Sequence, residues 1–326
     1  MDYSQGGFER NGSIFRHLRL KKEMLQHADA GHREIRPVLL GLSGVFRGVR
    51  CGAQLKVLHD HGYNDSFDHA VAVSTSAPAI GYSLAGQPAL GLSIYWDECL
   101  SGKFIPTHYS QLPWEVLKMF WTKGKDPLMD IEYLCDVFRG KVSNKALDQE
   151  AARRCRTRFS VAVTRCNDGE GMLLDAKKTN PDMVEAIRAS IAVPGVSNGK
   201  VRIDGVEYID GVGAMPFPIE LILRELDPTD ILVLANRAED ESIHLVEHLL
   251  TSLALHSEVA RVQEEFSTRE IRFAQSLELL RNWKGRWGIV WCPPDLHAVE
   301  VNPDKLQRAA KEAESIMTTL LRHETQ

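Results

Sequence analysis

The sequence predicts an α/β fold in which helices cover both faces of a mainly parallel central sheet. Two observations support this prediction. Short apolar runs, such as Val38 to Leu42 and Ile231 to Ala235, indicate strands that are buried on both faces. Segments of helical periodicity separate these runs, and such an alternation is typical of parallel strands joined by crossover helices. We therefore expect a three-layer α/β/α architecture.

The expected elements follow one another along most of the chain. A glycine at position 62 suits the end of the first core helix, and Asn180 is expected to cap a later helix with Pro181 in its first turn. Strands are expected at 38–42, 69–73, 159–163, 231–235 and 289–292, and helices at 49–62, from just after 76, at 181–194, within 241–282 and at 304–322.

The bulk composition is that of an ordinary globular protein. Of 326 residues, 44% are hydrophobic and 25% are charged, and the net charge of -5 argues against a generic nucleic-acid binder. None of the six cysteines has C-x-x-C spacing, so we expect reduced thiols, no metal and no cofactor. The polar N-terminus lacks a signal peptide, and no run approaches the ~20 apolar residues of a membrane span, so we expect a cytoplasmic protein.

The chain is expected to form one domain at 37–326, preceded by an N-terminal extension at 1–36. Ser13 could cap a short helix that carries Ile14, Phe15 and Leu18 among basic residues. Such a helix could make peripheral contact with an anionic membrane, or it could pack on its own domain. The small apolar face favours packing on the domain. The aromatic-rich segment 112–121 leaves a similar choice, between a lid or groove wall and a core helix, and the core helix is favoured.

Three segments carry candidate chemistry at the ends of expected strands. In the first, Ser43 to Gly48, backbone amides could hold a phosphate or an oxyanion, whereas the glycine spacing does not fit a dinucleotide site. In the second, Ser74 to Pro78, Ser76 is the candidate nucleophile of a strand-to-helix elbow, although such serines also cap helices. In the third, Asp210 precedes a glycine turn and is either a general base or a turn residue.

Taken together, these segments resemble the patatin-like phospholipase family over about residues 37–310. The family has a G-G-G-x-R-G loop, a G-x-S-x-G elbow and a D-G-G or D-G-A motif. This chain has Ser43-Gly44-Val45-Phe46-Arg47-Gly48, Ser74-Thr75-Ser76-Ala77-Pro78 and Asp210-Gly211-Val212. Residues 188–195 and the Pro293-Pro294 pair also resemble family segments. Five motif positions are substituted, and valine at position 45 is a poor occupant if that residue needs a positive φ.

The resemblance implies a serine acyl-hydrolase that acts on acyl-ester lipids or small esters. Ser76 would be the nucleophile, Asp210 the base, and the Gly44 and Val45 amides the oxyanion hole. Arg47, Gly48 and Gly211 would support the loops or contact an anionic head group. Burial should raise the pKa of Asp210. No motif selects His59, His69, His108 or His297 as a third catalytic residue. The substituted motifs leave open a pseudoenzyme that binds lipid or a protein partner, and an acyltransferase. The sequence does not predict an oligomeric state.

Overall fold

The computed structural model of the chain describes residues 7–26, 35–105, 128–194, 196–197, 199–239 and 260–324. The aromatic-rich segment 112–121 and residues 241–259 of the expected helical stretch 241–282 lie outside the described residues. All six cysteines are described, and all are free thiols.

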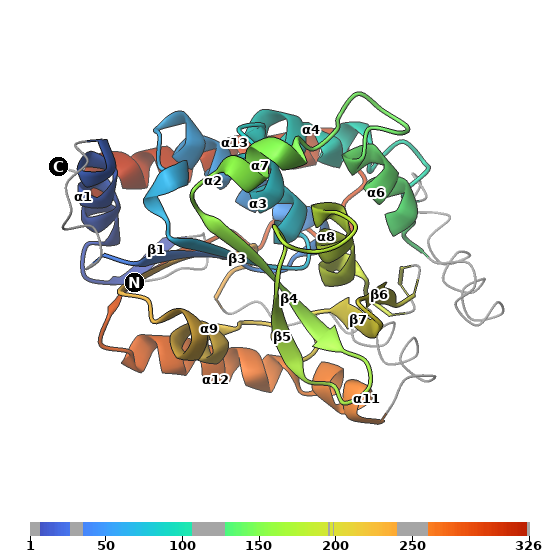
Figure 1. Ribbon diagram of the computed structural model, residues 1–326. Coiled ribbons are helices and arrows are strands. Elements are labelled where there is room, and N and C mark those ends of the chain that lie inside the picture. Colours follow the sequence, from blue (N-terminus) through green and yellow to red (C-terminus); the bar gives the residue numbers. More distant parts are fainter. Residues whose placement is uncertain are drawn as a thin grey trace.

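A mixed sheet runs through the centre of the molecule (Figure 1). Its order is β1-β9-β8-β2-β3-β4-β7-β6, with β5 also paired to β4. The five strands from β9 to β4 are parallel, while β1, β5, β6 and β7 pair antiparallel with their neighbours. The strands are β1 (Gly7–Asn11), β2 (Pro37–Gly41), β3 (His69–Val73), β4 (Arg158–Arg165), β5 (Gly171–Asp175), β6 (Val201–Ile203), β7 (Val206–Asp210), β8 (Asp230–Leu234) and β9 (Arg286–Trp291).

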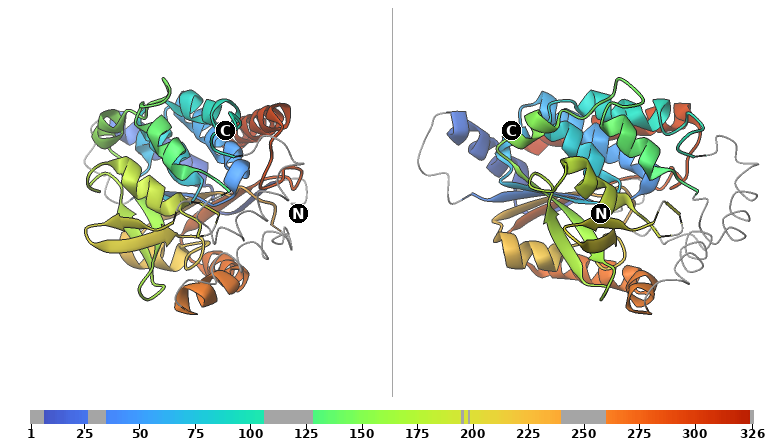
Figure 2. Two further views of the ribbon diagram at one scale, coloured as in Figure 1. Left: turned by 90° about the vertical axis from the view of Figure 1, so that its right-hand side faces the viewer. Right: turned by 45° about the vertical axis from the view of Figure 1, so that its right-hand side comes forward.

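Helices cover both faces of this sheet, as expected (Figures 1 and 2). The larger layer is formed by α1 (Ile14–Gln26), α2 (Gly48–Asp60), α3 (Ser76–Leu84), α4 (Pro88–Asp97), α6 (Ile131–Phe138), α7 (Gln149–Arg154), α8 (Met183–Ile191) and α13 (Pro303–Glu324). On the opposite face lie α9 (Ile219–Leu226), α11 (Ala260–Ser267) and α12 (Arg269–Asn282). Two short 3-10 helices, η2 (Val45–Arg47) and η3 (Asn64–Ser66), flank α2.

The apolar strands are buried because each serves two cores. In β2, Leu39 packs into the core under the larger helical layer, whereas Val38 and Leu40 pack into the core under α9 and α12. Side chains alternate between the faces of a strand, so a strand covered on both sides must be apolar throughout. The three-layer α/β/α prediction is therefore confirmed.

One expected helix start was placed incorrectly. The helix assigned to an Asn180 cap begins instead at Met183, and the Asp182 carboxylate caps it by accepting a hydrogen bond from the Glu185 amide at 3.1 Å. A side chain caps a helix from the position directly before the first helical residue. Asp182 occupies that position, whereas Asn180 lies two residues further upstream. The helix also ends earlier than expected, at Ile191.

The first described residues belong to the sheet and its core. Strand β1 pairs antiparallel with β9, and Ile14, Phe15 and Leu18, three of the apolar residues of α1, are fully buried. Lys21 Nζ is also buried, donating to the Ile35 carbonyl at 2.6 Å and lying 3.0 Å from Asp68 Oδ1. Helix α1 thus packs on its own chain, which was the favoured alternative. Among the described residues, none of the helices has the length and apolar character required to cross a bilayer.

The packing of α1 predicts a large stability difference between two substitutions in that helix. Phe15 is 0% exposed and Leu20 is 37% exposed. Replacing Phe15 by alanine leaves a cavity and should lower the free energy of unfolding by about 3–5 kcal/mol. Leu20→Ala is the matched control and should cost less than about 0.5 kcal/mol. Urea denaturation followed by circular dichroism measures both, and equal effects would contradict the packing described.

Candidate active site

One edge of β4 brings together the ends of two other strands. Strand β3 ends with Val73 opposite Ala162, and β7 ends with Asp210 opposite Val163. Strand β5 pairs with residues 160–164 of β4, and this range overlaps the parts of β4 that pair with β3 and with β7. Strand β5 therefore lies along one edge of β4, and β3 and β7 share the other edge. Val73 and Asp210 therefore lie at adjacent positions along one edge. The residue after Val73 is Ser74, so the fold places Ser74 beside Asp210.

Ser74 forms a strained turn between β3 and α3. Its φ is +56°, a conformation that costs a non-glycine residue about 1–3 kcal/mol. The Ser74 amide donates to Ser190 Oγ at 3.0 Å, and Ser190 Oγ donates to the Ala162 carbonyl at 2.9 Å. The end of α8 thus ties the turn to β4. The Ser74 side chain lines an apolar cavity, as the nucleophile of a strand-to-helix elbow must.

The position of Ser76 argues against the role predicted for it. Ser76 is the first residue of α3 and is 0% exposed. Its Oγ lies 2.7 Å from the Gly41 carbonyl oxygen and 2.9 Å from that of Val73, and accepts from the Val73 amide at 3.0 Å. A Cβ on Gly41 would lie only 2.6 Å from Ser76 Cβ, so the helix start is pressed against β2. Ser76 occupies the small-residue position of the elbow, and Ser74 occupies the turn that lines the cavity.

Hydrogen bonds to the amide and to the carbonyl group of Asp210 fix its backbone. Its amide donates to the Ala192 carbonyl at 2.9 Å, and its carbonyl accepts from Thr164 Oγ1 at 2.9 Å. The next residue must be glycine, because a Cβ on Gly211 would lie 2.5 Å from the Ala162 carbonyl oxygen. This close approach keeps the Asp210 turn against β4. Gly211 therefore supports the site through packing on the backbone.

The Asp210 carboxyl group is fully buried, and burial raises its pKa to about 7. A hydrogen bond from Ser74, the Val212 amide and the positive charge of Arg269 each lower the pKa and offset part of the effect of burial. Oδ1 accepts from the Val212 amide at 2.8 Å, while Oδ2 has no hydrogen-bond partner of standard geometry among the described residues. A carboxyl group with a pKa near neutrality is suited to accept and return a proton at physiological pH.

The loop before α2 also contains a strained residue. Val45 has a φ of +51°, which is an outlier for a β-branched side chain. The first bond of η2 runs from the Arg47 amide to the Gly44 carbonyl at 2.9 Å, and the Phe46 amide donates to the Ala298 carbonyl at 3.0 Å. The amides of Gly44 and Val45 precede these bonds, so the short helix itself offers them no acceptor. They can therefore serve an anionic ligand.

Neighbouring residues fix the shape of this loop. Asn236 Nδ2 donates to the Leu42 carbonyl at 2.6 Å, and Asn236 Oδ1 accepts from the Cys51 amide at 3.1 Å. A Cβ on Gly44 would lie 2.7 Å from Asn236 Cβ, so a larger residue there would displace the loop. Arg47 Nε donates to the Gly44 carbonyl at 3.4 Å, and Arg47 thus braces the same turn.

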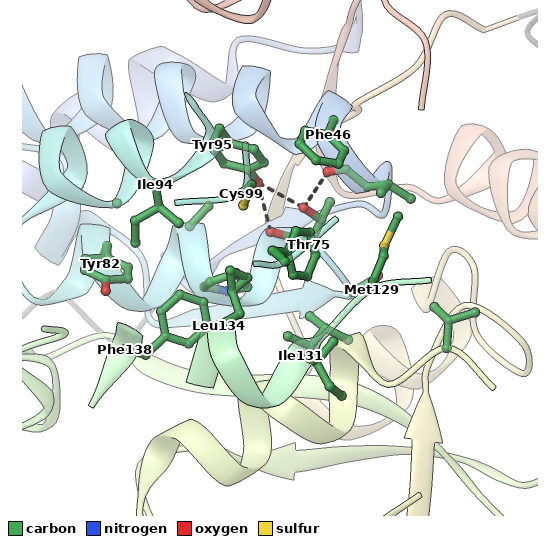
Figure 3. Close-up of a pocket in the computed structure, with 18 residues that line it drawn as sticks. Phe46, Thr75, Tyr82, Ile94, Tyr95, Cys99, Met129, Ile131, Leu134 and Phe138 are labelled. Atoms are coloured by element: carbon green, nitrogen blue, oxygen red, sulfur yellow. Dashed lines mark hydrogen bonds between the residues drawn. The ribbon is translucent and has the colours of Figure 1, made fainter. Parts of the chain in front are cut away.

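The cavity beside Ser74 is apolar and has a volume of about 90 Å³. No charged residue is among the described residues that line it. Figure 3 shows Tyr82, Ile94 and Phe138 at one end and Phe46, Thr75 and Met129 at the other. No histidine is among these lining residues, and His69 lies at the start of β3, the opposite end from Ser74. His108 lies outside the described residues. Within the described ranges, no group of side chains forms a metal site.

The sequence contained a signal for Ser74. The predicted strand ends at Val73, so the turn begins at the next residue. Positions two before and two after Ser74 are Ala72 and Ser76, both small, as the elbow requires. If Ser76 is taken as the nucleophile instead, the position two residues after it is occupied by Pro78. The sequence interpretation also missed the Thr75 amide, which lies at the start of α3 directly after Ser74.

The sequence of this chain is similar to that of a known protein family. The family model described as patatin-like phospholipase matches residues 44–223, more than half of the chain. Comparison with curated proteins found no match. Among solved structures, VipD from Legionella pneumophila aligns with a TM-score of 0.43 and 13% identity, covering 89% of this chain and 67% of that one. The match of the family model shows that the chain belongs to the patatin-like phospholipase family.

Proposed function

We propose that the protein hydrolyses acyl esters of lipids through a dyad of Ser74 and Asp210. The observation that carries the proposal is the pairing of a serine in a strained, cavity-lining turn with a buried carboxyl group whose pKa is about 7. The family to which the chain belongs supports lipid acyl-hydrolysis as the class of reaction. The identity of the dyad is our proposal.

In the first half of the reaction, the ionised Asp210 carboxylate accepts the hydroxyl proton of Ser74. Ser74 Oγ then attacks the carbonyl carbon of the ester, and the carbonyl oxygen becomes an oxyanion. Collapse of this intermediate breaks the ester bond, and Asp210 returns the proton to the departing alcohol. In the second half, a water molecule gives its proton to Asp210 and releases the fatty acid from Ser74.

The oxyanion is stabilised by backbone amides. Gly44 and Val45 contribute two of them, and Thr75 contributes a third from the beginning of α3, where the helix dipole also favours negative charge. Arg47 and Gly48 keep the loop in place, and Gly211 keeps the Asp210 turn against β4. All of these residues except Thr75 were predicted for the site from the sequence.

The apolar cavity indicates which part of a substrate enters the site. Its lining offers aliphatic and aromatic surface and no charge among the described residues, so an acyl chain gains from burial there whereas a charged head group would lose hydration. We therefore assign the acyl chain to the cavity and leave the head group outside it. No cofactor takes part in these steps.

A fluorophosphonate probe tests the nucleophile directly. Ser74→Ala removes the attacking oxygen and should abolish both labelling and ester turnover. Ser76→Ala is the matched control two residues away, and it should retain labelling at some cost in stability, because Ser76 Oγ bonds only to backbone groups. Labelling that disappears in the Ser76 variant and persists in the Ser74 variant would reverse the assignment. Absence of labelling in the unmodified protein would favour a pseudoenzyme.

Replacing Asp210 by asparagine should lower kcat by orders of magnitude, because the amide cannot accept a proton. In the unmodified protein, kcat/KM should fall about tenfold per pH unit below pH 7, where Asp210 becomes protonated. Asp204→Asn, at an exposed turn, is the matched control and should keep this profile. Product analysis with added alcohols during the same assay separates hydrolysis from acyl transfer.

The raised pKa of Asp210 also predicts a pH dependence of stability. The folded protein binds this proton more tightly than the unfolded chain does, so the stabilisation is present at low pH. It is lost as the pH rises from the ordinary aspartate range to about 7. Asp210→Asn cannot ionise and should therefore be at least as stable as the unmodified protein at pH 8. A lower urea midpoint for the variant at that pH would contradict the burial described.

A further inference from the structure

A hydrogen-bonded pair of side chains connects the Ser74 turn to the strained loop at Val45. Thr75 Oγ1 donates to the Val45 carbonyl at 2.7 Å and lies 2.9 Å from the hydroxyl oxygen of Tyr95 (Figure 3). The threonine hydroxyl has one proton, which the Val45 carbonyl takes, so Tyr95 must donate to Thr75. We propose that Thr75 and Tyr95 are positioning residues that hold Val45 in the backbone conformation which aims its amide at the oxyanion.

Val45 needs such support because its branched side chain disfavours the positive φ of its backbone. The family motif has glycine at this position, and glycine adopts a positive φ without steric cost. Valine at +51° is pushed towards a negative φ by its own branched Cβ. Rotation about the N–Cα bond would change the direction of the Val45 amide relative to the rest of the loop. A bond to the carbonyl of the same residue resists that rotation.

The geometry around the pair leaves no room for a looser arrangement. A Cβ on Gly48 would lie 2.3 Å from Thr75 Oγ1 and 2.4 Å from the Tyr95 hydroxyl oxygen. The two hydroxyl groups therefore pack directly against the start of α2. Tyr95 is buried on α4, and its burial raises the pKa of the phenol, which keeps it a neutral donor. Gly48 therefore supports the loop by leaving space for the pair.

Because of its position in the sequence, Thr75 connects the turn of the nucleophile to the oxyanion loop. Thr75 follows Ser74 directly, so its backbone is set by the nucleophile turn while its hydroxyl is bonded to the oxyanion loop. The pair thus fixes the distance between the attacking oxygen and the amides that receive the oxyanion. This inference rests on the proposed function, because the amide direction matters only if an oxyanion forms.

Thr75→Val tests the inference, because valine has nearly the same shape, keeps the Thr75 amide and lacks the hydroxyl. We expect kcat on a soluble p-nitrophenyl ester to fall at least tenfold, towards the ~10²–10³-fold loss that follows removal of an oxyanion donor, with KM changed less than about twofold. Thr75→Ser keeps the hydroxyl and should restore most of the lost turnover. Tyr95→Phe removes the contact with Thr75 Oγ1 and a longer one to the Thr75 carbonyl at 3.4 Å, and it should lower kcat on the order of fivefold.

The decisive experiment combines Thr75→Val with Val45→Gly. Glycine at position 45 adopts the required φ without support, so the double variant should recover most of the turnover lost in Thr75→Val. A residue that served only for packing would give additive losses instead. Ser93→Ala, also on α4, is the matched control for removal of a hydroxyl group and should leave kcat unchanged.

Each outcome has a defined meaning. Unchanged kcat in Thr75→Val, or a loss that Val45→Gly does not suppress, overturns the inference while leaving the dyad intact. A loss of kcat that parallels a loss of thermal stability across the series also overturns it. If the unmodified protein shows neither turnover nor labelling at Ser74, the proposed function fails and the inference fails with it.

Discussion

The sharing of one β4 edge by β3 and β7 is the constraint on which the candidate site depends. Two strands that enter from opposite directions end at adjacent residues of β4, Ala162 and Val163. Backbone hydrogen bonds fix this register, so the separation of Ser74 and Asp210 does not rely on flexible side chains. The buried position also explains the basicity of Asp210, because no solvent reaches the carboxyl group at the junction of the strands. Position and pKa therefore have one structural cause.

The rest of the site consists of supports for two residues with unfavourable backbone conformations. Ser74 and Val45 both have a positive φ, and neither is glycine. Strain of this kind persists only where neighbouring contacts determine the conformation. Ser190 provides such a contact for Ser74, whereas Asn236 and Thr75 provide them for the loop that contains Val45. At Val45, where the family motif has glycine, polar contacts from other elements thus hold the conformation that glycine would adopt freely.

The sequence was informative where one physical effect dominated. Because the parallel strands are buried on both faces, they appear in the sequence as continuous apolar runs. The bounds predicted for β3, 69–73, are those of the structure. Asp210 was identified because it follows a strand and precedes a glycine. The motif relies on small residues, and Ser74, Ser76 and Ala72 all qualify, so the sequence interpretation placed the nucleophile at Ser76, whereas we propose Ser74. Tertiary contacts decided between them: the Gly41 and Val73 carbonyls bury Ser76, and no local pattern encodes those contacts. The hydrogen bond between Thr75 and Tyr95 depends on helix packing, so it could not be predicted from a local sequence pattern either.

The pairing of β1 with β9 has a consequence for the order in which the chain can fold. Gly7 lies opposite Trp291, and Asn11 lies opposite Trp287. During synthesis β1 leaves the ribosome well before β9, because their paired residues are far apart in the chain. Until then Phe8 and Phe15, whose rings pack 5.4 Å apart, lack the strand that covers them. Apolar surface that waits for a partner so distant in the sequence is prone to aggregation during folding.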